Sequence, residues 1–156
     1  MRRLIETAQF LGWCVFALTA TPIHGQMKNP LAGAWKVTEI ANPNSPPITN
    51  PQAGLYLFTE KHYSAVRLNG EKPLPSYPSN DKATDADKVM DFNILYMNTG
   101  GYTVSGNKLT LSPVVAKSAF AMAPGRTLQY EFAMDGNMLT FVQRPAGPVL
   151  KFVRVE

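Results

Sequence analysis

The sequence predicts an all-β fold: an antiparallel up-and-down barrel of about eight strands, with one short helix near residues 84–97. Short segments that alternate in polarity, or are dense in β-branched and aromatic residues, recur along the chain after Gly33. Most connections between them are short, and Gly106-Asn107 and Asp135-Gly136-Asn137 are strong hairpin signals. The 156 residues suit one domain, which we expect to span residues 30–156.

The N-terminal residues have the pattern of a secretory signal. Basic Met1-Arg2-Arg3 precede an apolar run from Phe10 to Ala20, which is too short to span a bilayer as a stable helix. We therefore expect residues 1–25 to be a signal peptide and the protein to be exported, to the periplasm or out of the cell. An uncleaved amphipathic helix is the alternative.

Composition argues against several classes of function. The net charge of +4 is mild and the basic residues are scattered, so no nucleic-acid partner is expected. The one cysteine, Cys14, lies in the signal, so a mature chain has no disulfide, cysteine nucleophile or thiolate metal site. No nucleophile elbow, phosphate loop, zinc motif or dinucleotide fingerprint is present, and we expect no catalytic set, metal or cofactor.

The first strand is expected from Ala34 to about Ala41. Gly33 at its entry lets the backbone turn sharply, and Trp35, two residues on, can fill the closed end of a barrel. Regular alternation would point Glu39 to the same face as Trp35. A long loop rich in Asn and Pro follows, from 42 to about 51.

The next two strands, 54–59 and 62–68, form a predicted hairpin around Glu60-Lys61. A proline-rich loop then extends to residue 81, after which Thr84 is expected to cap a helix. The helix should end before Thr99. His62 is expected to be a solvated turn residue. The remaining strands are predicted at 101–105, 108–115, 126–134, 138–144 and 149–155.

The motif Leu31-x-Gly33-x-Trp35 resembles the opening motif of the lipocalins and their calycin relatives. It is most similar to bacterial lipocalin-like domains, in which a hairpin like that at 54–59 follows. The resemblance implies a structural role for Gly33 and Trp35, with a basic residue of the last strand packed on the tryptophan and bonded to backbone carbonyls. Arg154 is the natural candidate, and Lys151 the second. The resemblance also implies a small hydrophobic or amphipathic ligand inside the barrel.

One arginine and four aromatic residues are the candidate ligand contacts. An inward Arg67 would hold a carboxylate through bidentate hydrogen bonds, although Val66 and Leu68 could instead turn it outward. The aromatic residues would provide an apolar wall, or simply core: Tyr56, Phe58, Tyr102 and Tyr130. The mouth of the site is expected between the loops at 42–53 and 69–81.

Two other functions stay open from the sequence. An acid–base pair such as Glu39 with Arg67 would favour a small isomerase or hydrolase that uses the same cavity. A protein–protein interaction module would instead use the strand Leu55 to Phe58, which is apolar on both faces and would leave an exposed apolar patch. The sequence leaves the oligomeric state open.

Overall fold

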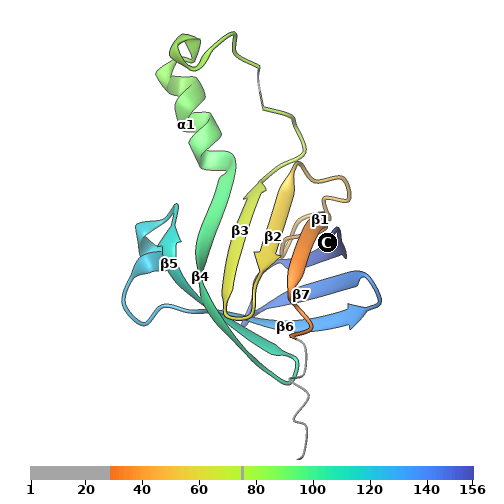
Figure 1. Cartoon of the computed structure of the whole chain (residues 1–156). Coiled ribbons are helices and arrows are strands. Elements are labelled where there is room, and N and C mark those ends of the chain that lie inside the picture. Colours follow the sequence, from red (N-terminus) through yellow and green to blue (C-terminus); the bar gives the residue numbers. More distant parts are fainter. Residues whose placement is uncertain (1–28, 75) are drawn as a thin grey trace, which may run out of the picture.

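The computed structural model describes residues 29–74 and 76–156, so the predicted signal peptide, with Cys14, lies outside the described residues. Each strand pairs with its sequence neighbours and β1 pairs with β8, which closes an antiparallel up-and-down barrel (Figure 1). The predicted fold class is confirmed. The strands are β1 (Gly33–Ala41), β2 (Gly54–Phe58), β3 (His62–Leu68), β4 (Leu95–Ser105), β5 (Lys108–Ala116), β6 (Leu128–Asp135), β7 (Met138–Arg144) and β8 (Val149–Arg154). The helical elements are η1 (Asn80–Lys82), α1 (Asp85–Ile94) and η2 (Ala119–Met122).

The helix is shorter, and the strand after it longer, than the sequence pattern predicts. α1 ends at Ile94 and passes directly into β4, although helical spacing extends to about residue 97 and the strand was expected from 101. The first seven residues of β4, from Leu95 to Gly101, pair with the whole of β3. This pairing satisfies the backbone groups of both strands, and it outweighs the local helical pattern.

A β-bulge in β1 places Glu39 on the outer face of the barrel. The register against β8 shifts between Val37 and Glu39, so that Ile40 is buried and Glu39 is not. The Glu39 carboxylate accepts a hydrogen bond of 3.0 Å from Nζ of Lys151. The expectation that Glu39 points inward with Trp35 is therefore wrong, because one extra residue reverses the faces of all the residues that follow it.

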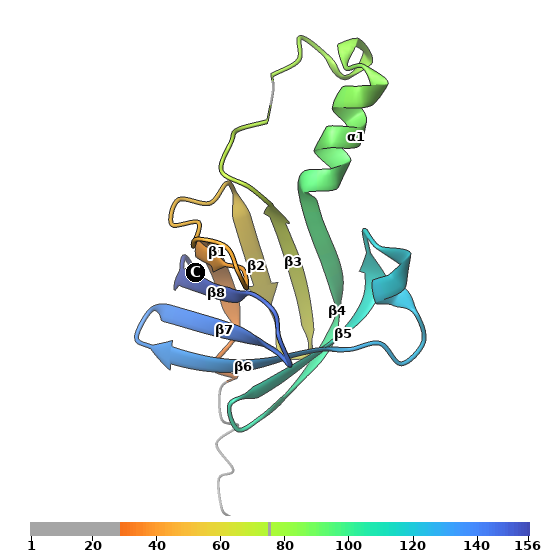
Figure 2. The ribbon, with the colours of Figure 1, turned by 180° about the vertical axis from the view of Figure 1, so that it is seen from behind.

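Strands β5 and β6 share a short seam, with four register pairs, as β1 and β2 do. Their register runs only from Lys108 to Leu111 on β5. Past Leu111, within the described ranges, β4 is the only strand paired with β5, and η2 follows at its end (Figure 2). A second bulge lies there, because Pro113 faces Gly100 and Val115 faces Thr99, with Val114 between them. Edges and bulges are the places in a sheet where proline is tolerated.

The narrow end of the barrel is closed around Trp35, which is fully buried. Its indole Nε1 donates to the Leu31 carbonyl at 2.8 Å. The Arg154 guanidinium lies 4.1 Å from the centre of the ring. Its Nη1 and Nη2 donate to the carbonyls of Ala32 and Pro30 at 2.6 and 2.9 Å. Gly33 has a φ of 127°, and a Cβ there would overlap the Arg154 guanidinium and the final backbone carbonyl.

Aromatic rings fill the barrel above Trp35. The Phe141 ring centre lies 5.1 Å from that of Phe152 and 6.0 Å from that of Phe58. Tyr56 packs edge-on against Phe152 at 4.9 Å, and Tyr102 against Phe58 at 5.3 Å. Edge-to-face contacts of this kind add to the free energy of burial, so this half of the barrel is a packed core.

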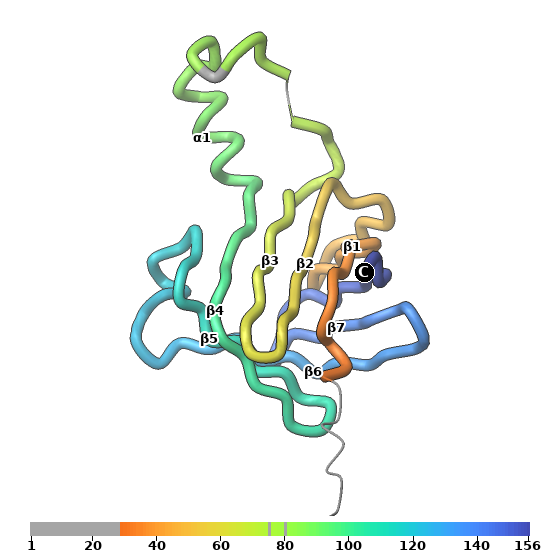
Figure 3. The backbone as a smooth tube through the Cα atoms, viewed as in Figure 1, coloured from red at the N-terminus to blue at the C-terminus, as the bar shows by residue number. Residues whose placement is uncertain are grey.

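Helix α1 stands above the barrel instead of packing on it (Figures 1 and 2). The backbone rises from β3 through the proline-rich loop to α1 and returns down β4 (Figure 3). The helix has a capping box: the Thr84 hydroxyl accepts from the Asp87 amide at 3.2 Å, and the Asp87 carboxylate accepts from the Thr84 amide at 2.9 Å. No residue of α1 is buried. In the part of the chain that the structure describes, no helix has the length and apolar character to cross a bilayer.

Candidate functional site

The wide end of the barrel, from which α1 rises, holds a buried arginine. Arg67 is the penultimate residue of β3 and shares its inner face with Tyr63 and Ala65. Its register partners are Gly54 on β2 and Tyr96 on β4. A Cβ on Gly54 would lie 2.9 Å from the Arg67 Cβ, so glycine at this position leaves the room that the arginine occupies.

Most of the Arg67 guanidinium has no polar partner. The side chain is only 8% exposed, and its Nε and Nη1 are buried without a hydrogen-bond acceptor among the described residues. The Tyr96 ring, with its centre 4.3 Å from Cζ, is the one aromatic face beneath it in that part of the chain. Arginine stays charged in proteins, and a buried charge without hydrogen bonds is costly. The position therefore favours an anion that would accept from these two nitrogens.

Tyrosine hydroxyls and one amide surround this arginine. The hydroxyls of Tyr56 and Tyr63 and the Oδ1 of Asn98 are buried and lack a hydrogen-bond partner among the described residues. The Asn98 Nδ2 donates to the Tyr96 hydroxyl at 2.6 Å. Asn98 is itself buried. Together with Arg67, the two hydroxyls offer hydrogen-bond donors, and the Asn98 Oδ1 offers an acceptor, in a region that water hardly reaches.

The phenols of this cluster stay protonated at neutral pH. Burial raises the pKa of Tyr56 and of Tyr130 well above the ordinary phenol value, and the positive charge of Arg67 opposes that rise in both. Burial also raises the pKa of Tyr63. These side chains are therefore neutral donors, and they do not neutralise the arginine.

Besides a surface groove of about 510 Å³ that Arg67 and Gly54 help to line, two cavities lie near this cluster. The smaller, about 140 Å³, is lined by Tyr96 and Asn98 of β4, by Asn69, and by residues at the end of β5 and in η2. The larger, about 520 Å³, lies between α1 and the loop after β3. Its lining includes Gln52 from the first long loop, and Asn69 again. The loops at 42–53 and 69–81 were expected to frame a mouth, and each contributes to this cavity.

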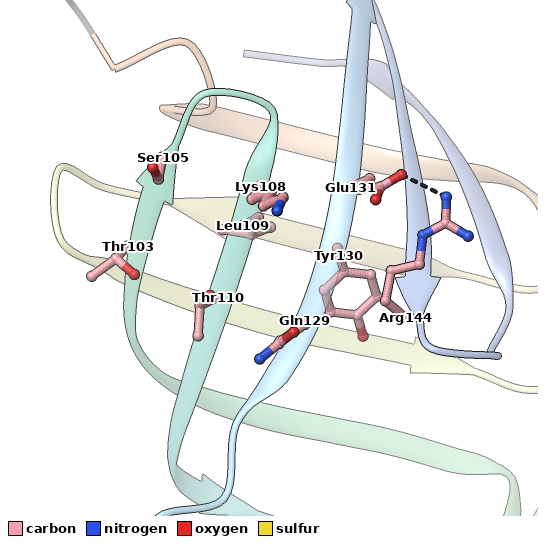
Figure 4. A pocket seen from close by; sticks show the side chains of 9 residues that line it. All are labelled: Thr103, Ser105, Lys108, Leu109, Thr110, Gln129, Tyr130, Glu131 and Arg144. Atoms are coloured by element: carbon pink, nitrogen blue, oxygen red, sulfur yellow. Dashed lines mark hydrogen bonds and ion pairs between the residues drawn. The ribbon is translucent and has the colours of Figure 1, made fainter.

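Another hollow, about 410 Å³, lies on β4, β5 and β6 and is of a different kind (Figure 4). Its charged walls are already paired: Arg144 donates to Glu131 at 2.5 Å, and both groups are exposed. This hydrogen bond lowers the pKa of Glu131 and raises that of Arg144. Of the predicted contacts only Tyr130 reaches this hollow, where the picture labels it beside Gln129. Exposed, paired charges give a ligand little to gain here.

The structure divides the predicted ligand contacts into two groups. Tyr56 and Tyr130 lie close enough to Arg67 that its positive charge acts to lower their pKa values, against the larger effect of burial. Phe58 and Tyr102 instead lie in the packed aromatic core, where the Tyr102 hydroxyl donates to the Thr59 carbonyl at 2.6 Å and also contacts the Asn29 amide. Among the described residues, Phe58 packs on Tyr63 and Tyr102, and neither Phe58 nor Tyr102 has a recorded interaction with Arg67.

Sequence reasoning did not identify Asn98 and Tyr63 as site residues. Asn98 falls in a segment that the helical pattern assigns to the end of α1, and so its alternation with Tyr96, Gly100 and Tyr102 was not recognised. That alternation has a period of two, and it is the signal that could have placed Asn98 inside the barrel.

Glu39 and the apolar residues Leu55 and Leu57, on which the two other candidate functions depend, lie on the outer face. Glu39 is held there by Lys151, so the acid–base pair of Glu39 with Arg67 does not form. Leu55 and Leu57 are each 43% exposed and Val66 is 39% exposed, which gives β2 and β3 an apolar outer surface. Within residues 29–74 and 76–156, no group of three or more acidic, histidine or cysteine side chains could hold a metal ion.

Comparisons with known proteins give likenesses of fold alone. No protein-family model matches the chain, and no curated protein matches it. A solved lipocalin-like protein from Bacteroides uniformis is similar over 80% of this chain and 97% of its own, with 15% identity and a TM-score of 0.49. An uncharacterized protein from Bacteroides eggerthii is similar over 80% of this chain and 98% of its own, with 10% identity and a TM-score of 0.49.

Proposed function

We propose that this protein binds a small amphipathic molecule with an acidic group at the wide end of the barrel, where Arg67 holds the acid. The observation that carries the proposal is the buried guanidinium whose Nε and Nη1 have no acceptor among the described residues. A carboxylate can accept from two guanidinium nitrogens at once in a planar, bidentate arrangement. It would supply the missing acceptors and the missing negative charge together.

The surroundings of Arg67 support an amphipathic ligand over a free inorganic anion. The hydroxyls of Tyr56 and Tyr63 could donate to the same acid, and both belong to side chains that otherwise pack in the apolar core. Ligand sites typically combine such an apolar lining with a few convergent polar groups. Hydrogen bonds to a charged group in this dry setting are worth more than those at the surface.

The test is binding of a fluorescent long-chain acid and of its methyl ester to the purified protein. The acid should bind at micromolar concentration. Arg67→Met should weaken it by about 10- to 100-fold, as the loss of charged hydrogen bonds implies, and should leave the ester nearly unchanged. Lys151→Met is the matched control, because it removes a cation from the outer face. Equal losses in the two variants, or no binding of the acid by the parent protein, would reject the proposal.

A second candidate, a protein-interaction surface, is supported by the exposed Leu55, Leu57 and Val66. These side chains belong to adjacent strands and project from the outer face of the barrel. Leu57→Lys should then abolish any association seen by light scattering. Its matched control is Val104→Lys, at an exposed apolar residue elsewhere. A monomer that both variants leave unaltered would count against this candidate.

We also propose that the protein is exported before it acts. The basic and apolar pattern of residues 1–25 supports export. A ligand-binding protein of this kind would then meet its ligand outside the cytoplasm.

A further inference from the structure

The barrel core gives an apolar chain no room below Arg67. Tyr56, whose hydroxyl lies in the polar cluster, packs its ring on Phe152, and Phe152 packs on Phe141. Phe58 and Tyr63 stack beside them, with ring centres 6.3 Å apart. To enter here, a ligand tail would have to displace close-packed rings, which costs more than the tail gains by burial.

An unfilled apolar space lies on the other side of the site, under α1. The cavity of about 520 Å³ has an apolar wall made by Met90 and Ile94 from the helix and by Pro73 and Leu74 from the loop after β3, and the charged Glu71 and Lys72 of that loop also line it. Met90 is 41% exposed, and α1 as a whole buries no residue. The helix therefore presents apolar side chains to a hollow that the described protein residues leave unfilled.

The C-terminal end of α1 is nevertheless held in place. The Asn69 amide donates to the Ile94 carbonyl at 2.7 Å, and Nζ of Lys117 donates to the carbonyls of Phe92 and Asn93 at 2.6 and 3.1 Å. These bonds tie the helix end to the loop after β3 and to the end of β5. The hollow under α1 is thus spanned by a fixed element, as a binding cavity requires.

Asn69 connects this hollow to the arginine site. It lines the cavity under α1 and also the 140 Å³ cavity, whose walls include Tyr96 and Asn98. The Tyr96 ring lies against the guanidinium of Arg67, and Asn98 is bonded to the Tyr96 hydroxyl. Arg67 itself lines neither cavity, but a chain of neighbouring residues, from Arg67 through Tyr96 to Asn69, leads from the buried cation to the hollow outside the barrel.

We infer that the ligand's apolar tail leaves the barrel past Asn69 and lies under α1, against Met90, Ile94 and Leu74. The inference rests on the proposed acid site and specifies its ligand class: an acid with a flexible, unbranched chain, in preference to a compact ring acid. The helix acts as one wall of the tail site, and the loop after β3 acts as the other. This explains why Met90 and Ile94 face a hollow that the helix itself leaves open.

The experiment measures the dissociation constants of butanoate, octanoate, dodecanoate and palmitate by calorimetry, using the full mature protein. Burial of each added methylene should tighten binding about fourfold until the hollow is filled, as the transfer free energy of a methylene implies. Met90→Glu should remove most of this dependence on chain length, because it places a charge in the apolar wall. Val89→Glu is the matched control, since Val89 lies next to it in the helix, is 59% exposed and does not line the hollow.

Nuclear magnetic resonance gives a second readout that does not depend on the variants. The Met90 methyl signal of the parent protein should shift with palmitate but stay in place with butanoate. A dissociation constant that does not change with chain length, or equal effects of Met90→Glu and Val89→Glu, would overturn the tail site and leave the acid site standing. If no acid binds at any length, or Arg67→Met binds them as the parent does, the acid site itself fails.

Discussion

The guanidinium of Arg154 lies over the ring of Trp35, 4.1 Å from its centre, and donates to two backbone carbonyls. Arg67 has the same relation to an aromatic ring, at 4.3 Å from Tyr96, but its Nε and Nη1 have no carbonyl or other acceptor among the described residues. The two arginines thus lie at opposite ends of one barrel. The guanidinium of Arg154 is hydrogen-bonded, whereas two nitrogens of Arg67 lack an acceptor among the described residues. Arg154 thus uses its donors to hold the chain, whereas Arg67 keeps two donors for the acid that we propose as its ligand.

Trp35→Ala should destabilise the protein by about 3–5 kcal/mol, because it removes a fully buried aromatic ring from a packed site. It also removes the donor to the Leu31 carbonyl. The free energy of unfolding from urea denaturation measures the loss. Trp35→Phe, which keeps an aromatic ring, should lose clearly less. An unchanged denaturation midpoint for Trp35→Ala would mean that this end of the barrel does not depend on the tryptophan.

Substitutions of Arg67 and of Arg154 should change the free energy of unfolding of the ligand-free protein in opposite directions. Arg67→Met removes a buried, poorly paired charge and should raise the free energy of unfolding by about 1–3 kcal/mol. Arg154→Met removes two bonds to carbonyls and should lower it by a similar amount, about 1–3 kcal/mol. Urea denaturation of both variants beside the parent decides the matter. A loss of stability in Arg67→Met as large as that in Arg154→Met would identify Arg67 as a structural residue.

Alkaline pH should destabilise the fold through its buried phenols. The pKa values of Tyr56, Tyr63 and Tyr130 are raised by burial, so at high pH the unfolded chain releases protons that the folded chain retains. Their contribution to stability is complete below about pH 10, the phenol value in an unfolded chain, and is lost as the pH rises beyond it. Ultraviolet absorbance should show these phenolates appearing only together with unfolding. Titration of all six tyrosines near their ordinary pKa in the folded protein would contradict this.

Helix α1 should unravel at acid pH while the barrel stays folded. The hydrogen bonds from Thr84 lower the pKa of Asp87, so the carboxylate contributes to helix stability above the pKa of an unfolded aspartate, and this contribution is lost as the pH falls through the lower folded value. Thr84→Ala should cost the helix about 1 kcal/mol at neutral pH, as the loss of an N-cap usually does. Amide exchange should speed up in α1 alone, since none of its residues is buried. Equal acceleration in β3 would show that helix and barrel unfold together.

If the protein is exported, the mature chain should lack the signal peptide at its N-terminus. The mature chain should begin between Thr21 and Met27, directly after the basic and apolar segment. N-terminal sequencing of protein recovered from outside the cytoplasm measures this. A chain that still begins at Met1 or Arg2 would contradict the signal-peptide interpretation.

The sequence predicts the barrel well because its signals are local. The turns at Gly106 and Gly136 fix two hairpins. Alternating polarity along the strands indicates which of their side chains face inward. Two errors have non-local causes. The bulge after Val37 depends on register against β8, and the early start of β4 depends on pairing with β3. No pattern confined to β1 shows the bulge, and in β4 the alternation of Tyr96, Asn98 and Tyr102 competes with the helical spacing of the same segment.

The candidate site was predicted only in part, for the same reason. Arg67 could be named from its strand, but its lack of an acceptor depends on what β2, β4 and β6 place around it. Phe58 and Tyr102 pack among the rings of the core, and the alternation of polarity along a strand does not show how such rings pack.

The short seam between β5 and β6 leaves the far half of β5 with a single strand neighbour in the described chain, and that half contains Pro113 and the bulge at Val114. Bare strand edges invite other chains to add to a sheet, and a proline and a bulge are two of the devices that discourage this. The seam between β5 and β6 can therefore stay short without making the far half of β5 a nucleus for aggregation.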